Sequence, residues 1–265
     1  MRTPRFSLLV LCCAVSMYAA TDSRQNIVVG PGDRFLCQLV DGDGWNTSFF
    51  LTNLDTKPIN YLVRFRDANF APLPLPVEGI PGAGTGIFGT IPVGQSVAFS
   101  TPGVAAQLSQ GWTLVTTFDR PATQTGAVTT TDLIGGQAIF RQRIAGRPDF
   151  EAVVPIERAA RRLTLPFDNR NNFSTGVALV NTDSTPMPIT LAGRDLLGAP
   201  LFTDTVTLTN GGKLVFSMPQ RYPASNGQIG VLLITTPGTD GVAALGLRFN
   251  PTGAFTSTPA LAPVP

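Results

Sequence analysis

Short runs of β-branched and aromatic residues, separated by turn-forming residues, recur along the chain from position 35 onward. Runs of this kind are typical of β-strands. In the first part of the chain the predicted strands cover residues 35–39, 48–54, 59–65, 87–91, 96–100, 112–118 and 137–143. In the second part they cover residues 163–167, 176–180, 189–193, 202–209, 213–218, 228–235 and 243–249. The pattern therefore predicts an all-β protein with seven strands in each part.

Helix is predicted almost nowhere. The 265 residues include 27 glycines and 23 prolines, which interrupt most windows long enough for a helix. The one helical candidate is IERAARR at 156–162, which either forms a single helical turn or stays extended as a linker.

The chain contains a duplicated unit. Residues 51–73 (LTNLDTKPINYLVRFRDANFAPL) match residues 179–201 (LVNTDSTPMPITLAGRDLLGAPL) at nine of 23 positions, with a constant offset of 128, as from Asp67 to Asp195. TIPVGQSVAFSTP from Thr90 then matches TLTNGGKLVFSMP from Thr207 at an offset of 117, so the first copy carries an insertion before Thr90. A second insertion lies between positions 102 and 141. Each copy has the length of one β-sandwich domain.

The N-terminus has the pattern of a secretory signal peptide, because Arg2 and Arg5 precede an apolar run that ends in small residues near Ala20. The alternative is a lipoprotein signal that ends at Cys12 or Cys13. We expect a signal peptide at 1–20, a leader at 21–33, a first β-sandwich domain at 34–155 with two insertions, a linker at 156–162, a second domain at 163–260 and a tail at 261–265. The localisation that follows is secreted or cell-surface, without a transmembrane segment.

The second copy carries a family resemblance. The segments GVALVNTDSTPMPITL, RDLLGAPL, GGKLVFS and VAALGLRFNPTGAFTSTP resemble tandem immunoglobulin-like or fibronectin-like β-sandwich repeats of exported bacterial proteins. The resemblance covers the second copy throughout and the first in outline, and no activity is assigned to those repeats. It implies two tandem immunoglobulin-like domains and export, and it transfers no site.

Composition excludes several functions. Without Arg2 and Arg5 the chain has 17 basic and 17 acidic residues, so nucleic acid and anionic membranes are poor partners. The chain has no histidine, which removes imidazole bases and the commonest transition-metal ligand. We expect no enzyme activity and no cofactor. Cys37 alternates with Phe35 and Leu39, which predicts a buried thiol.

The repeated polar residues have structural explanations. Asn53 and Asp55, like Asn181 and Asp183, stand where one strand turns into the next, and Asx side chains cap such turns. The segment DGDGWN supplies Asp41, Asp43 and Asn46 as a candidate calcium site, but it lacks the later acidic residue of a complete loop; a solvent-facing loop is the alternative.

Two features are candidates for ligand binding. Trp45 lies in a predicted loop, where a tryptophan can stack on a sugar. The inserted segment 119–136 is the second, because loops on a rigid sandwich commonly carry binding residues and a tolerated surface insertion is the alternative. Its donors and acceptors are Asp119, Arg120, Gln124, Thr129 and Asp132.

The sequence thus predicts an exported, non-enzymatic binding or structural module that contacts a protein or glycan at a cell surface, as an adhesion or scaffold component. A carbohydrate-binding accessory protein is the alternative, and a hydrolase that uses paired aspartates is a third. The sequence names no ligand and no oligomeric state.

Overall fold

A computed structural model describes residues 16–18, 30 and 32–263 of the chain. The N-terminal half contains β1 (Ser16–Tyr18), β2 (Arg34–Asp41), β3 (Trp45–Asn53), β4 (Ile59–Arg66), β5 (Leu75–Val77), β6 (Ile80–Gly84), β7 (Gly86–Ile91), β8 (Ser96–Ser100), β9 (Ser109–Phe118), β10 (Ile134–Gln142) and β11 (Phe150–Pro155). The C-terminal half contains β12 (Arg162–Asp168), β13 (Ser174–Asn181), β14 (Met187–Asp195), β15 (Pro200–Leu208), β16 (Lys213–Ser217), α1 (Met218–Arg221), η1 (Pro223–Ser225), β17 (Ile229–Thr235), β18 (Val242–Phe249) and β19 (Phe255–Pro259). The fold is all-β, as predicted.

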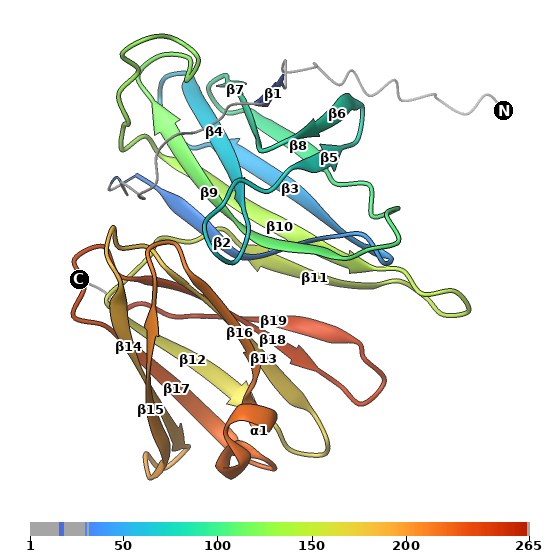
Figure 1. The fold of residues 1–265 in the computed structure, drawn as a ribbon, viewed down its shortest axis with the longest axis vertical. Helices are drawn as coiled ribbons and strands as arrows, with labels where there is room; N and C mark the ends of the chain where they lie inside the picture. The colour runs from blue at the N-terminus through green and yellow to red at the C-terminus, as the bar shows by residue number, and fades with distance from the viewer. Residues whose placement is uncertain (1–15, 19–29, 31, 264–265) are drawn as a thin grey trace, which may run out of the picture.

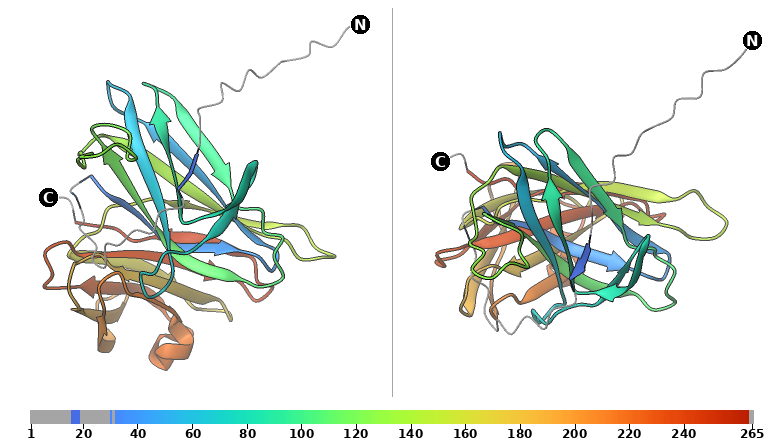
Figure 2. Two further views of the ribbon diagram at one scale, coloured as in Figure 1. Left: turned by 45° about the horizontal axis from the view of Figure 1, so that its top comes forward. Right: turned by 90° about the horizontal axis from the view of Figure 1, so that it is seen from above.

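Each half stacks two antiparallel sheets in the manner of a β-sandwich (Figures 1 and 2). In the N-terminal half the strand orders are β1-β7-β4-β9-β2 and β11-β10-β3-β8, and β5 pairs with β6 as a separate hairpin. In the C-terminal half the orders are β12-β17-β14-β15 and β16-β13-β18-β19. Read from the opposite edge, these are the orders of the N-terminal half without β1, β5 and β6. The strand order therefore recurs where the sequence repeats.

This order differs from that of an immunoglobulin sandwich. There the sixth and seventh strands share a sheet with the third. Here β17, the sixth strand of the C-terminal half, lies beside the third strand β14, whereas β18, the seventh, lies in the other sheet beside β13. The C-terminal half has eight strands instead of the predicted seven, because the segment FTSTP forms β19 and pairs with β18.

Each of the predicted strand segments overlaps an observed strand, while β1, β5, β6, β11 and β19 were not predicted. Of the two alternatives for 156–162, the helical turn does not form and the extended one is observed: Glu157 and Ala160 lie in extended backbone and form bridges to Phe35 and Val242. Phe35 of the N-terminal half and Val242 of the C-terminal half supply the backbone partners. The hydrogen bonds to them replace those that a helical turn would form within the segment. The observed helix is α1, which begins at Met218.

The predicted signal peptide lies outside the described residues, apart from the backbone of β1. That strand pairs with β7 from Ser16 opposite Phe88 to Tyr18 opposite Gly86.

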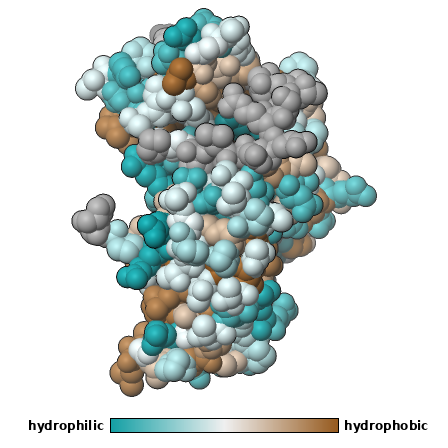
Figure 3. Space-filling model, turned by 60° about the vertical axis from the view of Figure 1, so that its left-hand side comes forward, coloured by the Kyte–Doolittle hydropathy of each residue, from teal (hydrophilic) through white to brown (hydrophobic). Residues whose placement is uncertain are grey.

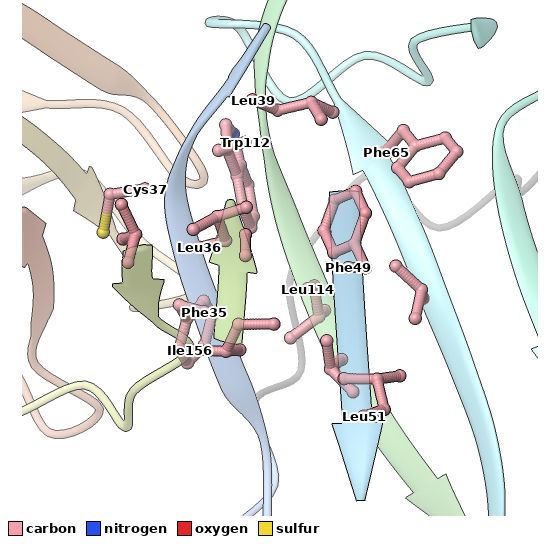
Figure 4. Packing of buried hydrophobic residues seen from close by; sticks show 14 of the residues in the cluster. Phe35, Leu36, Cys37, Leu39, Phe49, Leu51, Phe65, Trp112, Leu114 and Ile156 are labelled. Carbon is pink, nitrogen blue, oxygen red and sulfur yellow. The ribbon is translucent and has the colours of Figure 1, made fainter. Parts of the chain in front are cut away.

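The N-terminal half has its core between the two sheets. Phe49, Phe65 and Trp112 are fully buried there, and the Phe49 ring stacks on Phe99 with centroids 4.8 Å apart. Figure 4 shows that β2 bounds this core: Leu36 lies on the core side of the strand, whereas Cys37 points away toward the other half. Cys37 is buried, as predicted, and burial raises its thiol pKa to about 12.

One hydrophobic cluster continues from this core across the joint between the halves. Its members from the C-terminal half are the outward-facing residues of β13, β18 and β19, namely Ala178, Val180, Ala243, Leu245 and Phe255. A second cluster, which includes Leu165, Leu179, Ile189 and Leu232, fills the space between the sheets of the C-terminal half. The C-terminal half therefore has a core of its own and also buries the outer face of one sheet.

The repeated Asx residues cap turns, as predicted. The Asn53 amide donates to the carbonyls of Lys57 and Ile91, and its Oδ1 accepts from the Asp55 N–H. Asn181 makes the same bonds to Thr185, Leu208 and Asp183. Both asparagines are buried, so their hydrogen bonds satisfy backbone groups that water cannot reach.

Candidate functional site

An apolar groove lies in the joint between the two halves and encloses about 180 Å³. One wall is the outer face of the sheet that contains β13, β16 and β18, and the other is built from β2, β3, β9 and β10. The lining residues are Gln38, Val40, Trp45, Leu108, Gln110, Phe140, Gly176, Val177, Ala178, Val215, Leu245, Leu247 and Phe249. Gly176 and Ala178 on β13 have little side chain, which leaves space between the walls.

Trp45, a candidate from the sequence, lies at this groove. A two-residue turn between β2 and β3 positions it: Gly42 and Trp45 exchange two backbone hydrogen bonds of 2.9 Å, and Asp43 and Gly44 between them both have positive φ. This is the geometry that an Asp-Gly hairpin favours. The Trp45 ring is half-buried and packs on Phe255 of the C-terminal half, with centroids 5.1 Å apart. Trp45 therefore bridges the halves and forms part of one wall.

A lysine, Lys213, lies beside the groove. Lys213 and Val215 point to the same side of β16, and Val215 lines the groove. The Lys213 Nζ donates to Gln38 Oε1 and to the Gly111 carbonyl, both at 2.5 Å. No carboxylate forms an ion pair with it among the described residues. Burial lowers the pKa of Lys213 to about 7, so its ammonium is poorly compensated at neutral pH.

Because of Lys213, the free energy of unfolding should change with pH in the alkaline range. The unfolded chain keeps Lys213 protonated up to its ordinary pKa of about 10.4, whereas the folded chain releases the proton near pH 7. Because the unfolded state then binds more protons, the free energy of unfolding should rise between about pH 7 and 10. Lys213→Met should reduce this slope, and urea titrations of both proteins at several pH values measure it. Equal slopes would show that Lys213 titrates normally.

The candidate calcium ligands have other roles. Asp41 is buried, and its Oδ1 accepts from the Gly103 N–H at 2.8 Å. Asp43 is exposed at the tip of the two-residue turn, and Asn46 is buried with no partner for its Oδ1. Within residues 32–263, no three His, Cys, Asp or Glu side chains gather as they would around a metal ion.

The inserted segment 119–136 uses several of its polar groups in bonds within the segment or to other residues of the N-terminal half. Asp119 pairs with Arg120 at 3.0 Å and accepts from the Val128 N–H. Thr129 forms a bridge with Phe118. Asp132 is buried and pairs with Lys57 at 2.8 Å. Gln124 is exposed, and its N–H donates to the Pro121 carbonyl. The structure does not bring these side chains together with Trp45, and a binding role for this loop stays a hypothesis.

The sequence did not identify Lys213, Gln38 or Val215 as site residues. The signal that could have found Lys213 is its position in GGKLVFS, where a charged residue begins the otherwise apolar predicted strand 213–218. The hydrophobic pattern of β16 does not predict which of its faces packs against the other half, because that depends on how the two halves are arranged.

Comparison with protein-family models, curated proteins and solved structures finds no match for this chain. In the part of the chain that the structure describes, no helix has the length and apolarity needed to cross a membrane.

Proposed function

We propose that this protein is an exported, non-enzymatic binding module of two tandem β-sandwich domains, and that its ligand binds in the groove between them. The matching strand orders and the repeated Asx turns support a duplicated sandwich with a strand order of its own. The observation that carries the binding site is an apolar groove, walled by both halves, beside a lysine that has no acidic partner among the residues the structure describes.

The chemistry of the groove favours a small ligand with an apolar body and one anionic group. The apolar walls exclude water from an aliphatic chain or an aromatic ring, and a cavity of about 150 Å³ is known to hold a benzene-sized ligand. A carboxylate that reached Lys213 would supply the countercharge that the protein lacks there. Gln38 lines the groove and accepts from Lys213, so it marks where the anionic group would enter.

The carbohydrate alternative receives less support from this site. Sugars are held by many hydrogen bonds in addition to a stacking ring, whereas the groove offers chiefly the side-chain amides of Gln38 and Gln110. The Trp45 ring is also partly covered by Phe255. A cell-surface adhesion or scaffold role is compatible with a binding module of this kind.

Octanoate, octanol and octylammonium test the proposal, because they share one apolar chain and differ in charge. Isothermal titration calorimetry should show that octanoate binds about tenfold or more tightly than octanol, and octylammonium most weakly. Lys213→Met should reduce octanoate affinity to that of octanol. Trp45→Ala should weaken binding of both. Phe50→Ala, on the outer face of β3 away from the groove, is the matched control and should bind as the wild type does.

Two results would contradict the proposal. The first is an absence of binding by any of the three compounds, which would remove the groove as a site for small apolar ligands. The second is binding that Trp45→Ala leaves unchanged, which would place the ligand elsewhere on the protein.

A further inference from the structure

One contact between the halves is made by two turns. The turn that follows β4, residues 67–71, reaches the turn between β15 and β16, residues 209–212 (Figure 1). The Lys213 N–H, at the edge of β16, donates to the Ala68 carbonyl at 2.9 Å. The Phe70 ring covers Gly211 so closely that a Cβ at Gly211 would lie 2.5 Å from it. We call these the donor turn and the receiving turn.

The C-terminal half has its own donor turn, residues 195–199, with the same internal bonding. Asp195 Oδ1 accepts from the N–H groups of Leu197 and Ala199, as Asp67 Oδ1 accepts from Asn69 and Ala71. Gly198 has a φ of 85°, and Phe70, at the matching position, has a φ of 73°. The two turns therefore have matching backbone geometry.

This second donor turn is apolar and uncovered. The exposed fractions of Leu196 and Leu197 are 69% and 95%, and Leu197 is the most exposed of the large hydrophobic residues that the structure describes. Figure 3 shows hydrophobic side chains at the surface of the lower end of the molecule, where Figure 1 places the turn between β14 and β15. Two adjacent leucines that are this exposed form a contiguous apolar surface, and such surfaces mark contact sites.

The N-terminal half likewise has a second receiving turn, residues 92–95. The Gln95 N–H donates to the Pro92 carbonyl, and the Gln95 carbonyl accepts from Asn53, as Gly212 does with Thr209 and Asn181. Val93 at its tip is 51% exposed, and nothing lies within 4 Å of the place where a Cβ on Gly94 would be. This turn is therefore open where Gly211, its counterpart, is covered by Phe70.

The two uncovered turns lie at opposite ends of the molecule (Figures 1 and 2). We propose that the donor turn at 195–199 of one chain docks on the receiving turn at 92–95 of a second copy, so that the contact inside the chain is repeated between chains. The proposed contact differs from the internal one in its apolar side chains. On the donor turn, Leu196 and Leu197 take the role of Phe70. On the receiving turn, the apolar Val93 stands where the internal contact has the polar Asn210. A contact between two different surfaces does not close on itself as a symmetric dimer does, so it produces chains of molecules.

Sedimentation velocity of the whole chain over a wide concentration range tests this self-association. The wild type should form dimers and then longer species as its concentration rises. A variant with Leu196→Ser and Leu197→Ser should associate at least about tenfold more weakly, because it loses the buried apolar surface. Val93→Lys should do the same from the other side. Val104→Ser, 81% exposed elsewhere on the N-terminal half, is the matched control and should behave as the wild type.

Mixing the two variants distinguishes a head-to-tail contact from any other. The leucine variant keeps its receiving turn and the Val93 variant keeps its donor turn, so an equimolar mixture should form dimers that stop growing. A wild type that stays monomeric at all concentrations would overturn the proposal. So would association that depends on the leucines but not on Val93, or monomers that bind phosphatidylcholine vesicles through the leucines. The groove residues tested with octanoate lie in neither uncovered turn. A failure of octanoate to bind would therefore not affect the interpretation of the sedimentation experiment.

Discussion

Trp112→Ala is expected to lower the free energy of unfolding by about 3–5 kcal/mol, which is the usual cost of removing a large buried aromatic side chain. The Trp112 ring is fully buried, stacks on Phe70 with centroids 5.9 Å apart, and lies 6.3 Å from the Phe35 ring. A loss of this size is a large share of the stability of a typical domain. It should also loosen Phe70, which covers Gly211. The variant should therefore be destabilised in the joint as well as in the core.

Urea unfolding followed by circular dichroism measures this loss. Phe50→Ala is the control, since Phe50 is 37% exposed and should cost much less than Trp112. A cost for Trp112→Ala of below about 1 kcal/mol would mean that the ring is not part of the core.

The sequence predicted the all-β class and the positions of most strands because each strand has local signals. A glycine-containing turn precedes β8 and an asparagine-glycine turn precedes β16, and alternation is clear in β12, where Leu163, Leu165 and Phe167 are buried. The strands that it missed have weaker signals. β11 holds Glu151 among its apolar residues and β19 is largely polar (FTSTP), so their pairing with β10 and β18 gives them their structure.

The candidate site could be predicted only in part. The Asp-Gly turn and Trp45 are neighbours in sequence, so a loop tryptophan was visible as a candidate. Lys213 bonds to Gln38, which lines the groove with Trp45, only because the two halves pack against each other and join residues more than 100 positions apart. Local patterns carry no information on such a contact. The small residues Gly176 and Ala178 explain how the faces approach, yet small residues in a strand also suit a solvent-facing position.

Leu245 offers the sharpest test of how the halves are joined. It is 4% exposed and belongs to the cluster that crosses the joint, whereas its neighbour Ala244 packs against the core of the C-terminal half. Because successive side chains of a strand point to opposite faces, a change at Leu245 acts on the joint and spares that core. Leu245→Asp would bury a carboxylate with no partner, which costs about 3–5 kcal/mol when a charge is left uncompensated.

We therefore expect Leu245→Asp to separate the unfolding of the two halves. Each half has its own pair of sheets, so each can keep its fold when the joint opens, and scanning calorimetry should show two transitions where the wild type shows one. Val104→Asp is the control, because its side chain is 81% exposed and lies outside the joint, and it should leave a single transition with an unchanged midpoint. The groove needs both walls, so Leu245→Asp should also abolish octanoate binding. A single transition shifted to lower temperature would show instead that the two halves share one indivisible core.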